Sequence, residues 1–215
     1  MIRILSVLVF CCTAFAVQAG SLETAPTITE PMLTPTSVGV GSAWEGVYVG
    51  GFAAYETGEQ NYFSGGTFSN GPWGLEGIAY GAFAGINFQS GSLVYGAEAA
   101  YSIGEINSDV PSTFGANYSS FVDIKARAGY SIGDALVYGT LGGSLGYWED
   151  RTGPPDTASS TGINYGLGVD YLINDRMFVG AEYMVRDLAG DFDTDPSVGL
   201  DSLTQSARIR VGLQF

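Results

Sequence analysis

The chain ends in ARIRVGLQF, residues 207–215, and this stretch decides the fold. Apolar side chains alternate from Ala207 to Phe215, while Arg208 and Arg210 lie between them. A period of two is typical of a β-strand, whose successive side chains point to opposite faces. The chain has only eight Lys and Arg in 215 residues. Two of them in an otherwise apolar strand therefore need a physical explanation.

The same alternation recurs along the chain. It predicts eight strands, at residues 44–55, 77–89, 92–104, 119–132, 135–148, 161–173, 176–187 and 203–215. Each is about as long as the roughly 9–11 residues with which a tilted strand crosses a bilayer, or slightly longer. Beyond residues 1–19 there is no apolar run of about 18 residues, the length that indicates a transmembrane helix. Strands rather than helices are therefore expected to cross the membrane.

The connections between these strands alternate in length. Long polar loops are predicted at residues 56–76, 105–118, 149–160 and 188–202, and tight turns at Ser90-Gly91, Gly133-Asp134 and Asn174-Asp175. Outer-membrane barrels have long loops outside the cell and short turns in the periplasm. A soluble sandwich has no reason to sort its connections in this way. The prediction is an all-β fold, an eight-stranded antiparallel transmembrane β-barrel in an up-and-down meander.

Five of the predicted strands have one apolar face and one face with charges, at residues 92–104, 119–132, 161–173, 176–187 and 203–215. In residues 119–132 the apolar face opposes Asp123, Lys125 and Arg127. A soluble barrel with its apolar faces inward is the alternative. Against it stand many small Ala residues on those faces, 32 Gly in the chain, and aromatic positions that fall near the two ends of the strands. Girdles of aromatic residues mark the interfaces of membrane barrels.

The two arginines of the last strand are explained by the membrane. At about 3.3 Å per residue and a tilt near 40°, Arg210 lies roughly 13 Å above the periplasmic edge, near the bilayer midplane. An Arg facing lipid at that depth costs about 2–4 kcal/mol. A slip of one residue would turn both Arg208 and Arg210 outward. Both are therefore expected to point into the barrel and to determine the register of the strand.

Buried charges need partners, because an unpaired one is costly. Simple counting from the periplasmic strand ends places the inward charges in one layer, with Asp123 somewhat higher. The predicted lumen ion-pair network, four acids and four bases, is Glu98, Asp123, Lys125, Arg127, Asp170, Glu182, Arg208 and Arg210. We interpret it as a plug across the lumen. The alternative is that these carboxylates are catalytic or select an ion.

The first residues predict export. A basic Arg3, an apolar run over residues 4–17 and a small-residue site ending at Ala19 indicate a signal peptide, residues 1–19. An acylated Cys11 is disfavoured because Phe10 is too bulky for the position before it. Residues 20–43, rich in Thr, Pro and Ser, predict a flexible periplasmic linker. Residues 44–215 then form the barrel domain.

Charge and composition exclude several functions. Without Arg3 the net charge is 7 − 22 = −15, which argues against nucleic acid or any acidic surface as a partner. Neither Cys lies beyond residue 12, so no disulfide is expected in the exported chain. The chain has no His. General-base work would fall to a lone carboxylate, so the prediction is a non-enzymatic protein without a cofactor.

An acidic segment raises the question of a metal. Asp191, Asp193 and Asp195 have the spacing with which a calcium loop begins. Position six of that loop is Pro196 instead of Gly, and position twelve is Ser202 instead of Glu, so no EF-hand is predicted. A solvated acidic loop is the expectation, and loose binding of a divalent cation is the alternative.

The first predicted strand carries a resemblance. The residues Trp44-Glu45-Gly46-Val47-Tyr48-Val49-Gly50-Gly51 resemble the W-x-G-x-Y-x-G start of the small outer-membrane β-barrel family, which includes opacity-type surface proteins, major outer-membrane antigens and the transmembrane domain of outer membrane protein A. The terminal Phe215, preceded by Leu213 and Val211, is similar to the signal read by the barrel-assembly machinery. The resemblance covers residues 44–215 and implies the bacterial outer membrane, with lipid, lipopolysaccharide and the assembly machinery as partners.

Three functions stay open at this point. The first is envelope structure and surface display of four acidic extracellular loops, with a plugged lumen. The second is a narrow passive pore. The third is an adhesin or ligand-binding protein whose extracellular partner binds at loop aromatics such as Tyr62, Phe63 and residues 68–73.

Overall fold

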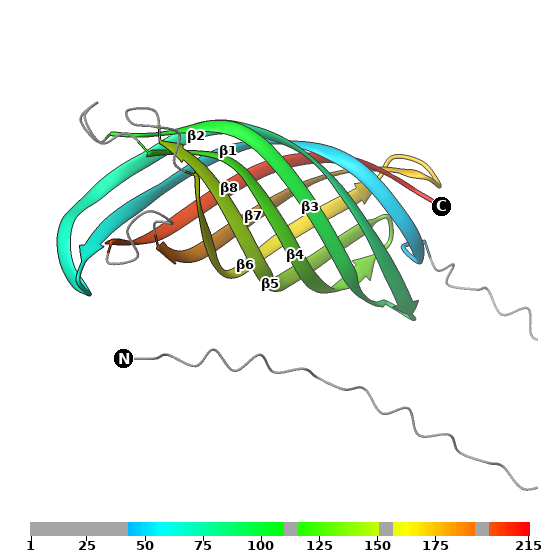
Figure 1. The fold of residues 1–215 in the computed structure, drawn as a ribbon. Helices are drawn as coiled ribbons and strands as arrows, with labels where there is room; N and C mark the ends of the chain where they lie inside the picture. The colour runs from blue at the N-terminus through cyan, green and yellow to red at the C-terminus, as the bar shows by residue number, and fades with distance from the viewer. Residues whose placement is uncertain (1–42, 110–115, 151–156, 192–197) are drawn as a thin grey trace, which may run out of the picture. The chain divides into compact units, whose positions relative to one another are not determined.

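The protein folds into a closed barrel of eight antiparallel strands (Figure 1). The computed structural model describes residues 43–109, 116–150, 157–191 and 198–215. The predicted signal peptide and residues 20–42 of the predicted linker lie outside them. The strands are β1 (Gly46–Ser64), β2 (Thr67–Ser90), β3 (Leu93–Ser108), β4 (Ala116–Ile132), β5 (Ala135–Asp150), β6 (Thr157–Leu172), β7 (Met177–Asp191) and β8 (Val198–Gln214).

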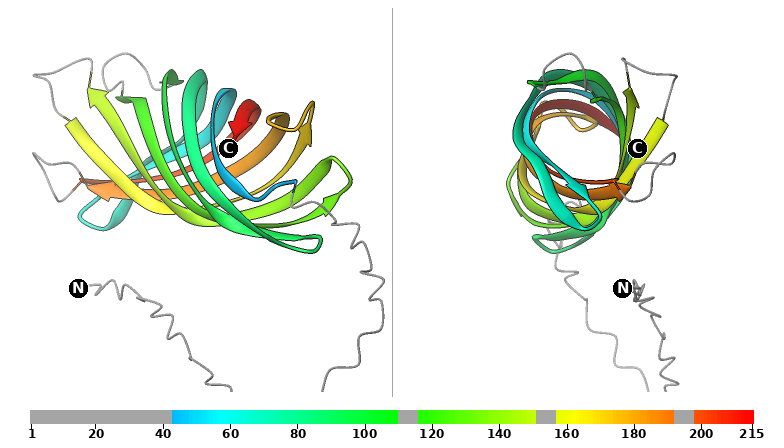
Figure 2. Two further views of the ribbon diagram at one scale, coloured as in Figure 1. Left: turned by 90° about the vertical axis from the view of Figure 1, so that its right-hand side faces the viewer. Right: turned by 60° about the vertical axis from the view of Figure 1, so that its left-hand side comes forward.

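Each strand pairs with its neighbours in sequence, and β8 pairs with β1 to close the ring (Figure 2). The closing register runs from Tyr48 opposite Gln214 to Ser64 opposite Val198. Closure satisfies the backbone hydrogen bonds that an open edge would expose to lipid. The predicted meander is confirmed. In the described part of the chain, no helix is long and apolar enough to cross a membrane.

The turns at one end of the barrel are short, as predicted. Gly91 and Gly133 adopt φ values of 60° and 59°, a left-handed conformation that glycine accepts without steric cost. The third turn is longer than the predicted pair of residues, because β6 ends at Leu172 and β7 begins at Met177. The side chain of Asn174 accepts hydrogen bonds from the backbone N–H groups of Arg176 and Met177, at 3.0 and 2.9 Å.

The predicted loop at residues 56–76 is wrong. Strands β1 and β2 continue through it as a hairpin that turns at Gly65 and Gly66. The alternation persists as far as Glu56 and Gln60, which are buried, but its inward residues are polar and look like a loop. Pairing of β1 with β8 as far as Ser64 supports the extension. The other three predicted loops are also shortened by longer strands, so a barrel wall replaces much of the expected loop.

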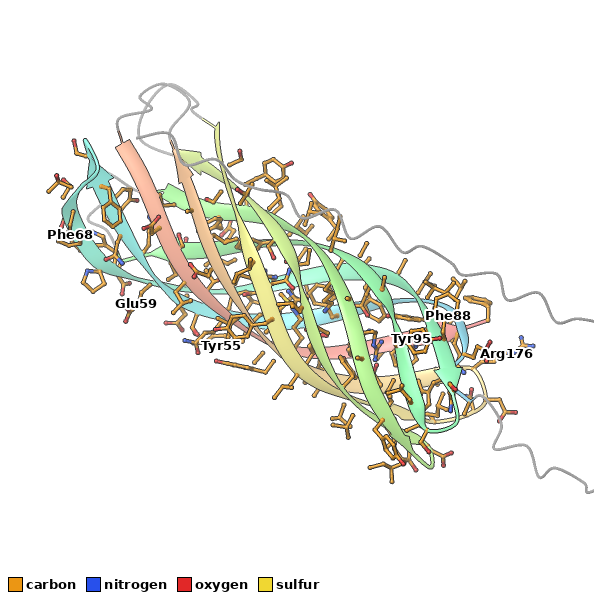
Figure 3. The ribbon with its side chains drawn as sticks, turned by 90° about the horizontal axis from the view of Figure 1, so that it is seen from below. Tyr55, Glu59, Phe68, Phe88, Tyr95 and Arg176 are labelled. Atoms are coloured by element: carbon orange, nitrogen blue, oxygen red, sulfur yellow. The ribbon has the colours of Figure 1, made fainter. Side chains whose placement is uncertain are left out.

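The apolar faces point outward, which is the reverse of a soluble barrel. Leu167 and Ile209 are both 72% exposed, although each lies in the middle of its strand. Exposed aromatic residues gather toward both ends, and Figure 3 shows Phe88 and Tyr95 near one end and Tyr55 toward the other. Phe88 and Tyr95 stack with ring centroids 5.7 Å apart. The soluble alternative is therefore excluded, and the predicted transmembrane orientation of the faces is confirmed.

Inward glycines make room for aromatic rings. A methyl group on Gly168 would lie 2.4 Å from the Tyr138 ring, and one on Gly85 would lie 2.4 Å from the Tyr48 ring. Eight strands leave an interior only just wide enough for side chains. The glycines let the rings of Tyr48 and Tyr138 lie across the neighbouring strands β2 and β6, so that their hydroxyls reach the charged residues at the centre.

We expect Gly168→Ala to destabilise the barrel by about 1–3 kcal/mol, because the methyl group overlaps the Tyr138 ring. The free energy of unfolding, measured by urea titration in detergent micelles, checks this. Gly139→Ala is the matched control, since its methyl group would meet nothing nearer than Leu167 Cδ2 at 3.7 Å. Equal stability of the two variants would contradict the proposed packing.

Candidate functional site: the interior of the barrel

The structure brings all eight charged residues of the predicted network into the interior. None of them is more than 4% exposed. They come from five strands, β3, β4, β6, β7 and β8. The period of two places them on inward faces, and the lipid-facing residues beside them are apolar. The site is therefore built from the walls of the barrel and contains no loop residue.

Arg210 is the centre of the part of the network that lies toward the short turns. Its guanidinium lies 2.6 Å from Glu98, 3.2 Å from Glu182 and 3.4 Å from Asp170. Lys125 also binds both glutamates, and its ammonium is 3.1 Å from Glu98. Arg210 and Lys125 thus each contact both Glu98 and Glu182, so each carboxylate has at least two cationic partners.

Two further pairs extend the network from this centre. Arg127 binds Asp170 at 2.8 Å and donates a hydrogen bond to the Tyr48 hydroxyl at 3.0 Å. In the other direction, Arg208 lies 3.0 Å from Asp123 and 3.5 Å from Glu182. Every predicted acid therefore contacts at least one predicted base.

Two charged residues of the site were missed in the sequence. Arg186 lies 2.9 Å from Asp123 and 3.0 Å from Glu56, and both Arg186 and Glu56 are buried. Arg186 follows Glu182 by four residues and so shares its face, which was an available signal. Glu56 falls in a predicted loop because the predicted first strand ends at Tyr55, whereas β1 continues to Ser64. Among the described residues, the interior therefore holds five acids and five bases, and their charges still cancel.

The ten residues form one continuous chain in which acids and bases alternate. Its order is Glu56, Arg186, Asp123, Arg208, Glu182, Lys125, Glu98, Arg210, Asp170 and Arg127. Asp170 lies two residues before the end of β6, and Glu56 lies ten residues after the start of β1. The predicted layer is therefore only part of the network. Arg186 and Glu56, which were not predicted, extend it beyond Asp123 into a column along the axis.

Aromatic rings surround the arginines. Each of the four arginines has its guanidinium carbon over at least one ring, and the nearest contacts are Arg127 over Tyr138 at 3.8 Å, Arg210 over Phe83 at 4.0 Å, Arg186 over Phe121 at 4.4 Å and Arg208 over Phe52 at 4.6 Å. These contacts add cation–π attraction and hold the planes of the guanidinium groups. Strands β2 and β5, which carry no member of the chain of ion pairs, supply Phe83 and Tyr138.

Apolar clusters accompany the column of charges in the interior. The lower cluster includes five large side chains toward the short-turn end, Trp44, Tyr48, Phe178, Leu136 and Leu172. The upper cluster, toward the opposite end, consists of Leu75, Ile106, Tyr118, Phe121, Leu188 and Leu200. Contact with such clusters limits the access of water to the charged groups, which strengthens their mutual attraction.

The remaining predicted residues are placed as follows. Val211, Leu213 and Phe215 share the outward face, and the Phe215 N–H donates to the carbonyl of Val47 at 2.8 Å. Asp191 is the last residue of β7, whereas Asp193 and Asp195 lie outside the described residues. Within the described ranges, no group of three acidic, His or Cys residues is placed to hold a metal.

Comparisons with known proteins agree with this architecture. Residues 7–215 match a family model described as outer membrane protein beta-barrel domain. The 22 kDa outer membrane protein of Rhizobium leguminosarum bv. viciae is 30% identical over 188 residues, which cover 80% of this chain and 79% of that protein. The 25 kDa outer-membrane immunogenic protein of Brucella abortus is 28% identical over 223 residues, covering 98% of this chain and 94% of that protein.

Solved structures show the same fold at low identity. OprG from Pseudomonas aeruginosa aligns with a TM-score of 0.54 and 15% identity, covering 80% of this chain and 96% of that one. Neisserial surface protein A aligns with a TM-score of 0.51 and 17% identity, covering 80% of this chain and 98% of that one. Together with the family match, the lipid-facing wall and the polar interior identify the chain as a member of the outer membrane protein beta-barrel family, located in the bacterial outer membrane.

Proposed function

We propose that this protein is a non-enzymatic outer-membrane scaffold whose lumen does not conduct, and whose role is envelope structure and surface display. The observation that carries the proposal is the continuous chain of ion pairs from Glu56 to Arg127, packed among aromatic and apolar side chains. An ion entering the lumen would have to separate charges that already hold one another. Separating buried pairs is costly, because each partner is left unpaired away from water.

The absence of enzymatic chemistry is part of the proposal. The chain has no His, so a nucleophile would need another base. The buried carboxylates are committed to arginines and Lys125, and no described carboxylate pair is left open to a substrate within the lumen. The names of the Rhizobium and Brucella relatives mention an outer membrane protein and an immunogenic protein, and neither name describes a catalyst.

Surface display is supported by where the charge lies. The ten interior charges cancel, so the net charge of −15 expected for the exported chain belongs to residues outside the lumen. The immunogenic relatives are consistent with exposed extracellular segments. We further propose that lipid and lipopolysaccharide surround the wall, and that the assembly machinery recognises Val211, Leu213 and Phe215 in the last strand.

In a planar bilayer we expect the refolded wild-type protein to show no steady single-channel conductance. Arg208→Ala/Arg210→Ala is expected to leak, because truncation empties the centre of the lumen and removes one cationic partner each from Glu98 and Asp123. Arg176→Ala, at an exposed turn, is the control and is expected to be silent. Steady conductance of the wild type would contradict a closed lumen and favour the narrow pore, with the interior charges as its selectivity filter.

We expect Arg186→Met to lower the free energy of unfolding by about 3–5 kcal/mol, because it leaves Asp123 and Glu56 facing each other without their shared cation. Adding Asp123→Asn and Glu56→Gln to this variant is expected to recover much of the loss. Urea titration in micelles, followed by tryptophan fluorescence, measures both. A single variant as stable as the wild type would show that the ion-pair chain does not support the barrel.

A further inference from the structure

The β1–β2 hairpin rises beyond the lipid-facing wall of the barrel. The outward girdle residues Tyr55 and Tyr80 are followed, toward the hairpin, by outward acids, and β1 then continues to Ser64. Figure 3 shows Phe68 at the far end, beyond Glu59 and Tyr55. At about 3.3 Å per residue, the nine residues from Tyr55 to Ser64 span roughly 30 Å along the strand. The hairpin therefore stands well outside the bilayer.

The outer edge of β2 has an open stretch in this hairpin. β2 pairs with β3 up to Leu75 opposite Ser108, and the Asp109 N–H then donates to the Gly74 carbonyl at 3.0 Å. Further out, Thr67, Phe68 and Asn70 pair with β1 across a shifted register, and residues 67–71 pair with no other described strand. Pro72 has no N–H to offer, so we define the open edge as residues 67–71. Unpaired strand edges accept an extended chain as an additional strand.

The hairpin has the composition of a binding surface. Residues 60–74 contain no charged residue, although the chain as a whole is strongly acidic, and they consist largely of Asn, Ser, Thr, Gly and aromatic residues. Phe68 is 55% exposed and packs edge-on against Phe63, with ring centroids 6.1 Å apart. Rigid aromatic side chains among small polar residues are what binding loops use for contact area and adaptable hydrogen bonds.

Carboxylates lie at the lower end of the open edge. The Asp109 carboxylate covers Gly74, because a methyl group there would be 2.8 Å from Asp109 Oδ2. Glu76 is exposed two residues further along β2, and Glu59 and Asp201 are diagonal neighbours on β1 and β8. Of the described cations, Arg176 alone lies outside the lumen, at the opposite end of the barrel. A strand that docks here therefore meets negative charge at this end.

We propose that the open edge of β2 binds an extended, basic peptide segment of a partner protein as an added strand. Main-chain hydrogen bonds to residues 67–71 hold the segment, and Phe68 with Phe63 contacts an apolar side chain of it. Lysine or arginine residues at one end of the segment face Asp109 and Glu76. This surface is independent of whether the lumen conducts, so it goes beyond the scaffold function.

The probe is a fluorescent synthetic peptide in which Thr and Val alternate and several Lys follow, titrated against the refolded full chain by anisotropy. We expect saturable binding that weakens about tenfold when alternate backbone nitrogens of the peptide are methylated, since those nitrogens no longer donate. Replacing Lys by Glu in the peptide is expected to weaken binding by a similar factor, and added salt is expected to weaken binding of the lysine peptide.

Protein variants locate the site. Phe68→Ser is expected to weaken binding about tenfold, and Asp109→Asn/Glu76→Gln several-fold. Phe88→Ser, an exposed aromatic at the other end, is the matched control and is expected to bind as the wild type. The proposal is overturned if the wild type does not bind, if the methylated peptide binds equally well, or if Phe68→Ser and Phe88→Ser have the same effect. Retained binding of the methylated peptide would indicate attraction by charge alone.

Discussion

Lipid on the outside forces every charge of the membrane-spanning wall to the inside. The outward faces are apolar, so the charged residues of the wall have nowhere else to point, and the narrow lumen brings them within contact distance. Neutrality follows from the cost of a buried unpaired charge. Five acids and five bases meet this condition in one continuous series of ion pairs, in which Arg210 contacts three carboxylates. The paired charges of the interior are thus a consequence of the apolar outward faces of the wall.

Packing and electrostatics depend on each other in this interior. Tyr138 reaches Glu182 only because Gly168 leaves room for its ring, and its hydroxyl donates to that carboxylate at 3.2 Å. The same ring lies against the Arg127 guanidinium. A glycine on one strand, a ring from the next and a charge from a third therefore act together. Substitutions that keep every charge but change the volume, such as Gly168→Ala, therefore also disturb the network.

Much of the fold follows from the period of two in the sequence. The inward direction of Arg208 and Arg210 is determined by the lipid cost of the alternative register, and the structure agrees. The hairpin at residues 56–76 was not predicted, because the buried inward residues Glu56 and Gln60 are polar, so the apolar pattern stops before the strand does. Glu56, which lies in this segment, was therefore left out of the predicted ion-pair network. Arg186 was missed although it continues the face of Glu182. These two residues extend the predicted layer into a column of charges.

Most basic side chains of the folded barrel are hidden from reagents that recognise them. Lys125 is the only lysine of the chain, and it is buried at the centre of the barrel with four of the seven arginines. Of the cleavage positions for trypsin in the described residues, Arg176 alone is at the surface. Amine-directed labels likewise find no described side-chain amine on the outside. Digestion and labelling thus distinguish the inserted barrel from the unfolded chain, in which all of these groups are accessible.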